Sequence, residues 1–383
     1  MFANKVLGER SSVGPKDSDV RFMRLALAEA RKGAGKTSPN PAVGAVVVRR
    51  GKVLAKGYHR GAGEPHAEVV ALEKINCKAE GATLYVTLEP CNHHGRTPPC
   101  THAILRAGVS RVVVGMEDPN PDVKGGGCRY LEEHGVQVKV GVLEEECRRL
   151  NEAYIKFVTT KRPFVVLKSA ATLDGWMGTR SGDSKWITGP AARRYVHRLR
   201  QASDAVMVGA GTVVKDDPLL TARDVANPAR QPLRIVVDNG LCSPIGAKIF
   251  TTAGDVPTTV VVGMKCKATA KLKSLEKMGV SIVRCPLKRG MIDLNALMDI
   301  LGGMEIQSLL VEGGARLNYS LIRERLVDKL NTFLAPKLLA GGDGIPIFFG
   351  RGPARIEDCL KLKELSLRKF DQDIMVTAYP QYE

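Results

Sequence analysis

Four residues of the sequence have types and spacings suited to metal chemistry. His66 and Glu68 are separated by one alanine, and Cys91 and Cys100 follow further along the chain. One imidazole and two thiolates form a borderline-soft ligand set that suits Zn²⁺. Three protein ligands leave a hydrolytic zinc centre one position for water, and Glu68 would stand beside that water as a general base. The pattern therefore predicts one catalytic zinc ion.

The cysteine spacing departs from the motif of the nucleobase deaminases, in which H-x-E is followed by P-C-x-x-C. The H-x-E and P-C parts are present, but eight residues separate Cys91 from Cys100. The alternative is a surface histidine with buried apolar cysteines. It is disfavoured because each candidate ligand stands at an expected strand-to-helix junction. Cys77, Cys128 and Cys147 lack this context and are interpreted as core or surface thiols.

The stretch between the two cysteines carries a more specific signal. "SPNPAVGAVVV" (38–48), "GYHRGAGEPHAE" (57–68) and "LEPCNHHGRTPPC" (88–100) follow one another along the chain. In order and spacing they resemble the pyrimidine deaminases of riboflavin biosynthesis, which form the N-terminal half of a bifunctional deaminase–reductase. The resemblance implies a cytidine-deaminase-like fold for this half of the chain.

The same resemblance implies how the substrate is held. It assigns Asn40 to the pyrimidine, and His59, His93 and Arg96 to the phosphoribosyl group. An asparagine amide can read the edge of a heterocycle, and a basic loop suits a phosphate. Without the resemblance, a turn asparagine and a solvated basic loop would be equally favoured.

Three glycine-containing stretches in the second half of the chain could bind a ligand. They are "KSAATLDGWMGTRSGDSKWITG" (168–189), "DAVMVGAGTVVKDDPLLTAR" (204–223) and "VEGGARL" (311–317). Loops at strand ends bind ligands in α/β domains, and the third stretch places free N–H groups at a helix start, where a phosphate can bind. The glycine pattern of a Rossmann domain is not found at the first strand–helix turn.

Together these stretches resemble the C-terminal reductase of the same bifunctional family, over residues 164–223 and 308–320. The resemblance implies a fold similar to dihydrofolate reductase, with NADPH as the cofactor. The residues that it places against the substrate are Ser184, Arg200, Leu220, Arg223 and Glu312. Those that it places against NADPH are Ala170, Trp186, Thr212, Asp216, Gly314, Ala315, Arg316, Leu317, Asn318, Tyr319 and Ser320.

Lys168 and Asp216 are the candidates for moving a proton during hydride transfer. Two alternatives are equally favoured: Lys168 is a surface lysine at a strand end, and Asp216 caps a helix or turn.

The elements that must position the first site follow from hydrophobic periodicity. A helix is predicted over 20–33, a hairpin over 42–48 and 52–59, and then helices and strands in alternation. These are a helix (66–77), a strand (82–88), a helix (100–107), a strand (111–116) and a helix–strand pair (128–142). A charged helix over 144–163 is closed by Pro163. We place a domain boundary near residue 161, which gives a three-layer α/β domain over 1–161.

A second α/β domain is predicted over 162–383. Its strands are expected at 164–171, 204–209, 233–239, 258–263, 280–285 and 308–314, with helices at 190–201 and 315–326 among those between them.

Composition limits the classes of partner. The net charge of +17 is compatible with nucleic acid, but aromatic residues are 5% and no basic run exceeds three residues. Base-stacking surfaces need aromatic side chains, so the charge favours small phosphorylated substrates. Nine scattered cysteines indicate a reducing compartment, and with no apolar run long enough for a membrane or a secretory signal, a cytoplasmic location is predicted.

The preferred hypothesis is a bifunctional enzyme of riboflavin synthesis. Zinc-dependent deamination of a diaminopyrimidinone ribosyl phosphate would precede reduction of its ribosyl group to ribityl by NADPH. This predicts a small-molecule substrate, no nucleic acid and no membrane, and leaves a homo-oligomer open. One alternative is a nucleic-acid-binding protein with a four-ligand structural zinc, completed by His93, His94 or His102. Another is a tRNA-editing deaminase, which the long cysteine spacing and the second domain disfavour.

Overall fold

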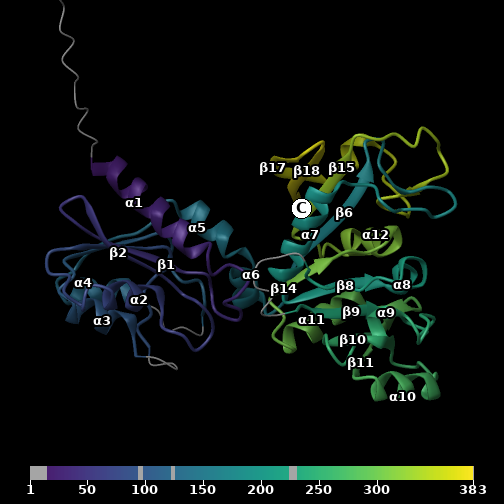
Figure 1. Cartoon of the computed structure of the whole chain (residues 1–383), viewed down its shortest axis with the longest axis horizontal. Helices are drawn as coiled ribbons and strands as arrows, with labels where there is room; N and C mark the ends of the chain where they lie inside the picture. The colour runs from purple at the N-terminus through teal and green to yellow at the C-terminus, as the bar shows by residue number, and fades with distance from the viewer. Residues whose placement is uncertain (1–14, 94–97, 122–125, 224–230, 383) are drawn as a thin grey trace, which may run out of the picture. The chain divides into compact units, whose positions relative to one another are not determined.

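The computed structural model describes residues 15–93, 98–121, 126–223 and 231–382. The chain divides into two compact units, Met1–Thr159 and Thr160–Glu383 (Figure 1). No helix in these described ranges is both long and apolar enough to cross a membrane.

The described strands of the first unit form one five-stranded sheet in the order β2-β1-β3-β4-β5. β1 is antiparallel to β2 and β3, whereas β3, β4 and β5 are parallel. The elements are α1 (Pro15–Ala30), β1 (Gly44–Arg49), β2 (Lys52–Tyr58), α2 (Ala67–Glu73), β3 (Thr83–Val86), α3 (Cys100–Arg106), β4 (Arg111–Val114), α4 (Gly127–Glu133), β5 (Gln137–Lys139), α5 (Glu144–Leu150) and α6 (Glu152–Thr160).

Alternating side chains bury both faces of this sheet. Val47, Leu84 and Val112 pack with residues of α2, α3 and α4, while Val46 and Val113 pack with residues of α1 and α5. Because strand side chains alternate with period two, short β-branched runs can supply both cores. The predicted three-layer arrangement is confirmed.

The described strands of the second unit include a nine-stranded sheet, in the order β11-β10-β9-β8-β14-β6-β15-β18-β17. It is parallel from β11 to β15, and β18 and β17 continue it antiparallel. Its elements are β6 (Phe164–Thr172), β7 (Trp176–Gly178), α7 (Pro190–Gln201), β8 (Ala205–Gly209), α8 (Ala210–Asp216), β9 (Leu233–Val237), α9 (Lys248–Thr251), β10 (Thr258–Gly263), α10 (Thr269–Lys277), β11 (Val280–Cys285), β12 (Leu287–Lys288), β13 (Met291–Ile292), α11 (Leu294–Gly303), β14 (Ser308–Val311), α12 (Ala315–Arg323), β15 (Lys329–Ala335), β16 (Ile345–Pro346), a 3₁₀ turn (Ile356–Asp358), β17 (Lys361–Phe370) and β18 (Asp373–Gln381).

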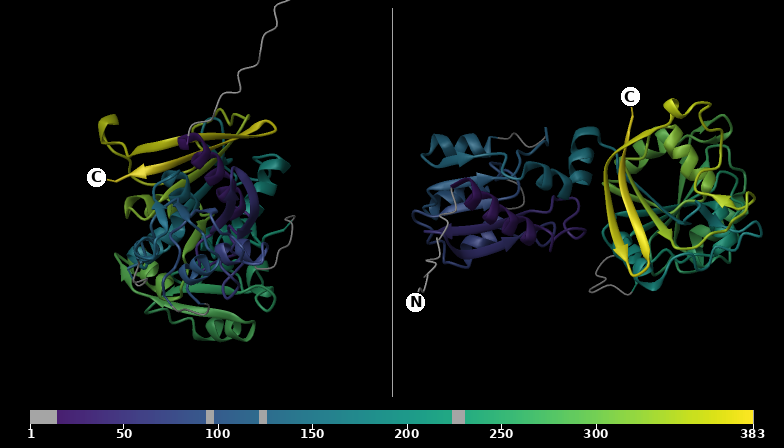
Figure 2. Two further views of the ribbon diagram at one scale, coloured as in Figure 1. Left: turned by 90° about the vertical axis from the view of Figure 1, so that its left-hand side faces the viewer. Right: turned by 90° about the horizontal axis from the view of Figure 1, so that it is seen from above.

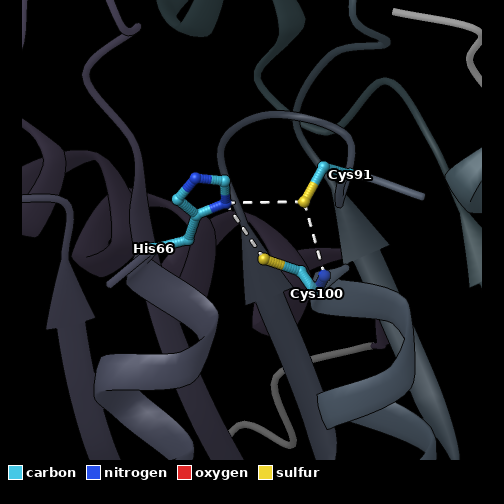
Figure 3. Close-up of side chains that lie close together, drawn as sticks. All are labelled: His66, Cys91 and Cys100. Carbon is cyan, nitrogen blue, oxygen red and sulfur yellow. Dashed lines mark hydrogen bonds between the residues drawn. The ribbon is translucent and has the colours of Figure 1, made fainter. Parts of the chain in front are cut away.

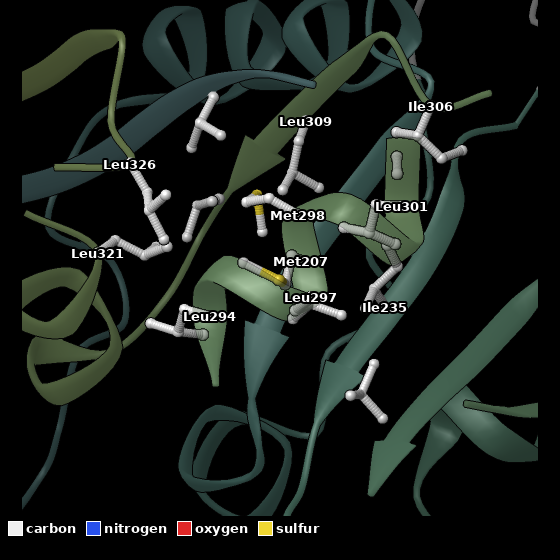
Figure 4. Close-up of a cluster of buried hydrophobic side chains, with 14 of the residues drawn as sticks. Met207, Ile235, Leu294, Leu297, Met298, Leu301, Ile306, Leu309, Leu321 and Leu326 are labelled. Carbon is white, nitrogen blue, oxygen red and sulfur yellow. The ribbon is translucent and has the colours of Figure 1, made fainter. Parts of the chain in front are cut away.

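Helices cover both faces of this larger sheet. Met207 and Leu309 pack against Leu297, Leu301 and other residues of α11 and α12 on one face (Figure 4). Residues of α9 and α10 pack against β8, β9 and β10 on the other face. The hairpin of β17 and β18 lies at one edge of the sheet (Figure 2). The α/β fold class predicted for this half of the chain is confirmed.

Several expected bounds need correction. The helix predicted over 20–33 is Pro15–Ala30, and the helix predicted over 66–77 ends at Glu73. The charged segment predicted as one helix over 144–163 forms two helices, α5 and α6, which are separated at Asn151. Asn151 leaves helical geometry, with φ −112° and ψ 22°, and its side chain bonds to Ala42 instead. The helix predicted over 315–326 ends at Arg323.

Candidate active sites

The three predicted zinc ligands meet at the carboxyl ends of β2 and β3. His66 Nδ1 lies 3.1 Å from Cys100 Sγ and 3.5 Å from Cys91 Sγ (Figure 3). The three possible ligand atoms all lie within 4.8 Å of one another. His66 directly precedes α2, and Cys100 is the first residue of α3. Cys91 lies in the segment that follows β3, which ends at Val86.

This donor set fits a catalytic zinc ion. One imidazole and two sulfurs are ligands that zinc accepts in tetrahedral sites, and three of them leave the fourth position open. Hydrogen bonding from the Cys100 thiol outweighs burial and lowers the pKa of Cys91. The same contact and burial raise the pKa of Cys100. Among the described residues, neither His93 nor His102 joins the group, in contrast to the four-ligand structural zinc considered above.

Glu68 lies in the first turn of α2, two positions after the histidine ligand, and its side chain is buried. Burial raises the pKa of its carboxyl to about 7. A carboxyl with a pKa in this range can both accept and release a proton near neutrality.

Asn40 and His59 form a hydrogen-bonded pair beside the metal site. Asn40 Nδ2 lies 3.0 Å from His59 Nε2, and His59 Nδ1 lies 3.1 Å from the carbonyl oxygen of Pro65. A carbonyl can only accept, so Nδ1 carries the proton and Nε2 accepts from the Asn40 amide. Burial also lowers the pKa of His59. The neutral imidazole thus fixes the Asn40 amide group with its oxygen free to accept from a ligand.

The other residues predicted to contact the substrate at this site differ in their burial. His59 is buried, with 2% of its surface exposed, and in the structure it makes the hydrogen bond that holds the Asn40 amide. His93 is exposed. Arg96 and His94 lie outside the described residues. The predicted contacts of His59, His93 and Arg96 with the phosphoribosyl group stay predictions.

One supporting residue of the zinc site was not singled out from the sequence. The Glu89 carboxylate accepts hydrogen bonds from the backbone N–H groups of Asp118 and Cys128. It thereby ties the segment that carries Cys91 to the loop after β4 and to the start of α4. An acidic residue directly before Pro90 was the available signal, but its partners are distant in the sequence.

The second unit holds a cavity of about 2080 Å³. This exceeds the 300–1,000 Å³ that is common for one small ligand, and so it leaves room for a dinucleotide beside a substrate. The predicted residues that line it are Lys168, Ala170, Ser184, Trp186, Arg200, Thr212, Asp216, Leu220, Arg223, Glu312, Gly314, Ala315, Arg316, Leu317, Tyr319 and Ser320.

Asn318 is the exception among the predicted cofactor residues. Its side chain is fully buried, and its amide donates to the carbonyl oxygen of Ile347 at 3.0 Å. A backbone hydrogen bond, from Phe349 N to Ala315 O, also connects the neighbouring segment to α12. The Asn318 side chain therefore helps to hold the segment that contains Ile347, and its contact with the cofactor stays a prediction.

A buried ion pair marks one region of the cavity. Arg200 donates to both carboxylate oxygens of Glu312, at 2.5 and 3.0 Å, and Lys168 Nζ lies 3.6 Å from the same carboxylate. Burial would raise the pKa of Glu312, but Arg200 and Lys168 outweigh it and lower the pKa to about 2. Burial lowers the pKa of Lys168, which suits a group that must release a proton.

Two helix starts face the cavity and fit the phosphates of a dinucleotide. Gly209 precedes α8 and Gly314 precedes α12, and neither helix has a side-chain cap. A Cβ atom built on Gly314 would lie 3.6 Å from Thr212 Oγ1, so the two starts are neighbours. Their N–H groups and helix dipoles favour anions.

The other predicted residues extend this cavity wall. Asp216, the last residue of α8, accepts a hydrogen bond from Ser184 Oγ at 3.3 Å. Trp186 is 64% exposed and lies under the guanidinium of Arg193, 4.4 Å from the ring centre. An exposed indole on a cavity wall is free to contact a planar ligand.

Sequence reasoning missed the residues that hold the loop containing Leu220. Gln231 bonds to both the N–H and the carbonyl of Ala222. The fully buried Arg234 donates to the carbonyl of Leu219 and to that of Thr252. A glutamine before a strand and an arginine within it give no sequence signal of these contacts.

Comparison with known proteins accounts for both units. The family described as "Cytidine and deoxycytidylate deaminase zinc-binding region" matches residues 16–116, and "RibD C-terminal domain" matches residues 163–376. The riboflavin biosynthesis protein RibD of Aquifex aeolicus is 44% identical over 94% of this chain and 98% of its own length. The corresponding protein of Escherichia coli is 40% identical over 93% and 98% of the two chains.

Solved structures agree with these relatives. Acinetobacter baumannii RibD has 36% identity and a TM-score of 0.85, with 96% of this chain and 100% of that chain covered. A deaminase/reductase from Thermotoga maritima has 36% identity and a TM-score of 0.83 over the same shares. Matched over nearly its whole length, the chain belongs to the RibD family of bifunctional deaminase–reductases of riboflavin biosynthesis.

Proposed function

We propose that the chain performs the two reactions of its family at two separate sites, a deaminase within residues 1–161 and a reductase within residues 162–383. The Thermotoga maritima relative is named as a diaminohydroxyphosphoribosylaminopyrimidine deaminase and a 5-amino-6-(5-phosphoribosylamino)uracil reductase. The corresponding starting compound here is 2,5-diamino-6-ribosylamino-4(3H)-pyrimidinone 5′-phosphate. The final product is 5-amino-6-ribitylaminouracil 5′-phosphate.

In the deaminase, His66, Cys91 and Cys100 hold zinc, which when bound supplies Lewis-acid activation of a water molecule. Glu68 takes a proton from the attacking water and delivers it to the departing amine, so that ammonia leaves. Its buried position next to the ligands supports this role. Asn40 orients the pyrimidine through the amide oxygen that its bond to His59 leaves free. The basic loop with His93 and Arg96 binds the phosphoribosyl group.

In the reductase, NADPH, when bound, would supply the hydride that reduces C1 of the ribosylamino group. The starts of α8 and α12 would hold its phosphates, and Trp186 would contact one of its rings. Lys168 supplies a proton as the sugar ring opens, and Asp216 orients the reacting groups through Ser184. The Arg200–Glu312 pair, with Arg223 and Leu220, holds the ribosyl phosphate in place.

The observation that carries this proposal is the meeting of His66, Cys91 and Cys100 next to the buried Glu68. Zinc removal provides its test. After treatment with a chelator, release of ammonia from the phosphorylated diaminopyrimidine should be lost. Oxidation of NADPH with the already deaminated pyrimidine should continue. Undiminished ammonia release from zinc-free protein would contradict the metal assignment.

The same proposal predicts a small-molecule enzyme of the cytoplasm that binds no nucleic acid and no membrane. The basic charge of the chain then attracts the substrate phosphate, which both sites must bind. A homo-oligomer remains compatible with this account. A gel-shift experiment at physiological salt should show no complex with RNA or DNA.

A further inference from the structure

Asn151 interrupts what would otherwise be one helix, and it uses its side chain for a distant contact. Its N–H bonds to Arg148 O at the end of α5, and its carbonyl accepts the first hydrogen bond of α6, from Ile155 N. The side-chain oxygen accepts from Ala42 N at 2.8 Å, and the side-chain nitrogen donates to Ala42 O at 3.1 Å. Asn151 is 4% exposed, so both bonds are made away from water.

The contact lies two residues from the proposed pyrimidine-binding Asn40. The segment around Asn40 is outside regular structure, because α1 ends at Ala30 and β1 begins only at Gly44. Buried backbone groups need hydrogen-bond partners, and Asn151 supplies both partners of Ala42. The amide acts as a neighbouring strand would, fixing the backbone ahead of β1.

The arrangement also limits how Asn40 can move. Asn40 N donates to Thr37 O at 2.8 Å, and the Asn40 side chain bonds to His59. Asn151 fixes the chain on the other side of Pro41. Displacing Ala42 would therefore rotate the Asn40 amide away from its hydrogen bond to His59. That hydrogen bond is what leaves the amide oxygen of Asn40 free to accept from a ligand.

We propose that Asn151 is a positioning residue of the deaminase, which sets the affinity for the pyrimidine by holding the Asn40 segment through Ala42. The inference rests on the proposed role of Asn40. It explains why α5 and α6 are two helices: a continuous helix would not direct an amide at both backbone groups of Ala42.

The test compares Asn151→Ala, Asn151→Asp and Arg148→Ala in the full-length zinc-loaded protein. Asn151→Ala removes both bonds, while Asn151→Asp keeps the acceptor and loses the donor to Ala42 O. Arg148→Ala removes only an exposed pair with Glu144 on the same helix and serves as the matched control. The readouts are KM and kcat for ammonia release, zinc content, and NADPH oxidation with the deaminated pyrimidine.

For both Asn151 variants, KM for the diaminopyrimidine should rise roughly tenfold to a hundredfold, because a buried hydrogen bond to the pyrimidine is lost from the ground state and the transition state alike. The kcat should stay within about threefold, because the zinc ligands and Glu68 are untouched. Zinc content and NADPH oxidation should be unchanged, as should all values for Arg148→Ala. An unchanged KM, or a loss of zinc and kcat with KM preserved, would overturn the proposal.

A double-mutant cycle with Asn40→Ala separates this inference from the proposed function. If Asn151 acts through Asn40, the double variant should have a KM close to that of Asn40→Ala alone, a non-additivity expected of coupled residues. If Asn40→Ala raises KM but Asn151→Ala does not, only the positioning role is wrong. An unchanged KM in Asn40→Ala would overturn both.

Discussion

Glu68 is the residue on which the proposed deamination chemistry depends most directly. Removing its charge while keeping its shape, as in Glu68→Gln, should lower kcat for ammonia release about a thousandfold, a typical loss for a proton-transferring group. Bound zinc should remain, because the three ligands are unchanged. Glu73→Gln, an exposed position of the same helix, should have no effect. Full ammonia release from Glu68→Gln would mean that another group moves the proton.

Glu312 should make the reductase unit sensitive to acid. The pKa of Glu312 is lowered from 4.5 to about 2, a displacement worth about 3 kcal/mol of folding free energy. Because the folded pKa is the lower one, this stability is present above pH 4.5 and is lost as the pH falls toward 2. Glu312→Gln leaves Arg200 buried without its counter-ion, so it should destabilise the unit by roughly 3 kcal/mol at pH 7.

Tryptophan fluorescence can measure this effect in the full-length chain. Both tryptophans of the sequence, Trp176 and Trp186, belong to the second unit. Urea unfolding followed at pH 7, 4.5 and 3 should show a smaller difference between Glu312→Gln and the unaltered chain as the pH falls. An equal difference at all three pH values would contradict the assigned linkage.

At the scale of secondary-structure elements, the most testable feature is the close approach of α4 to the segment that carries the zinc ligand Cys91. Gly127, the first residue of α4, faces the carbonyl of Pro90 so closely that an added Cβ would collide with it. Gly127→Ala should therefore push the segment that carries Cys91 and weaken zinc binding. The expected result is a fall in bound zinc and in ammonia release, with NADPH oxidation unchanged.

Gly61→Ala is the matched control, because a Cβ there would come no closer than 3.8 Å to its nearest neighbour, Lys36 O. Zinc content can be measured on both proteins after dialysis against a weak chelator. Equal retention of zinc by the two variants would show that the Pro90 contact does not set the geometry of the Cys91 segment.

The elements that could be predicted from the sequence are those with a regular hydrophobic period. Short β-branched runs such as Thr258–Gly263 were predicted with the bounds that the structure has. The strands β15, β17 and β18 were not predicted, and in β17 the alternation is broken by a register shift between Lys363 and Ser366. Glu364, within that shift, has a φ of 55°. The single-residue break at Asn151 also leaves no trace in the helical period.

The site residues divide in a similar way. The zinc ligands and Glu68 could be predicted because they stand at strand and helix ends within short motifs. Asn151, Gln231 and Arg234 could not, since their partners are Ala42, Ala222 and Leu219. Each is a polar side chain that satisfies backbone groups of a distant loop, and only the folded chain brings the two together.

At the scale of the whole molecule, the central claim is that one chain carries two consecutive reactions. The direct test supplies the protein with the phosphorylated diaminopyrimidine and NADPH, and follows ammonia and NADPH together. Ammonia should appear first, and NADPH oxidation should follow after a lag, with one of each per substrate. NADPH oxidation on the undeaminated compound without ammonia release, or ammonia release with no subsequent oxidation, would contradict the account.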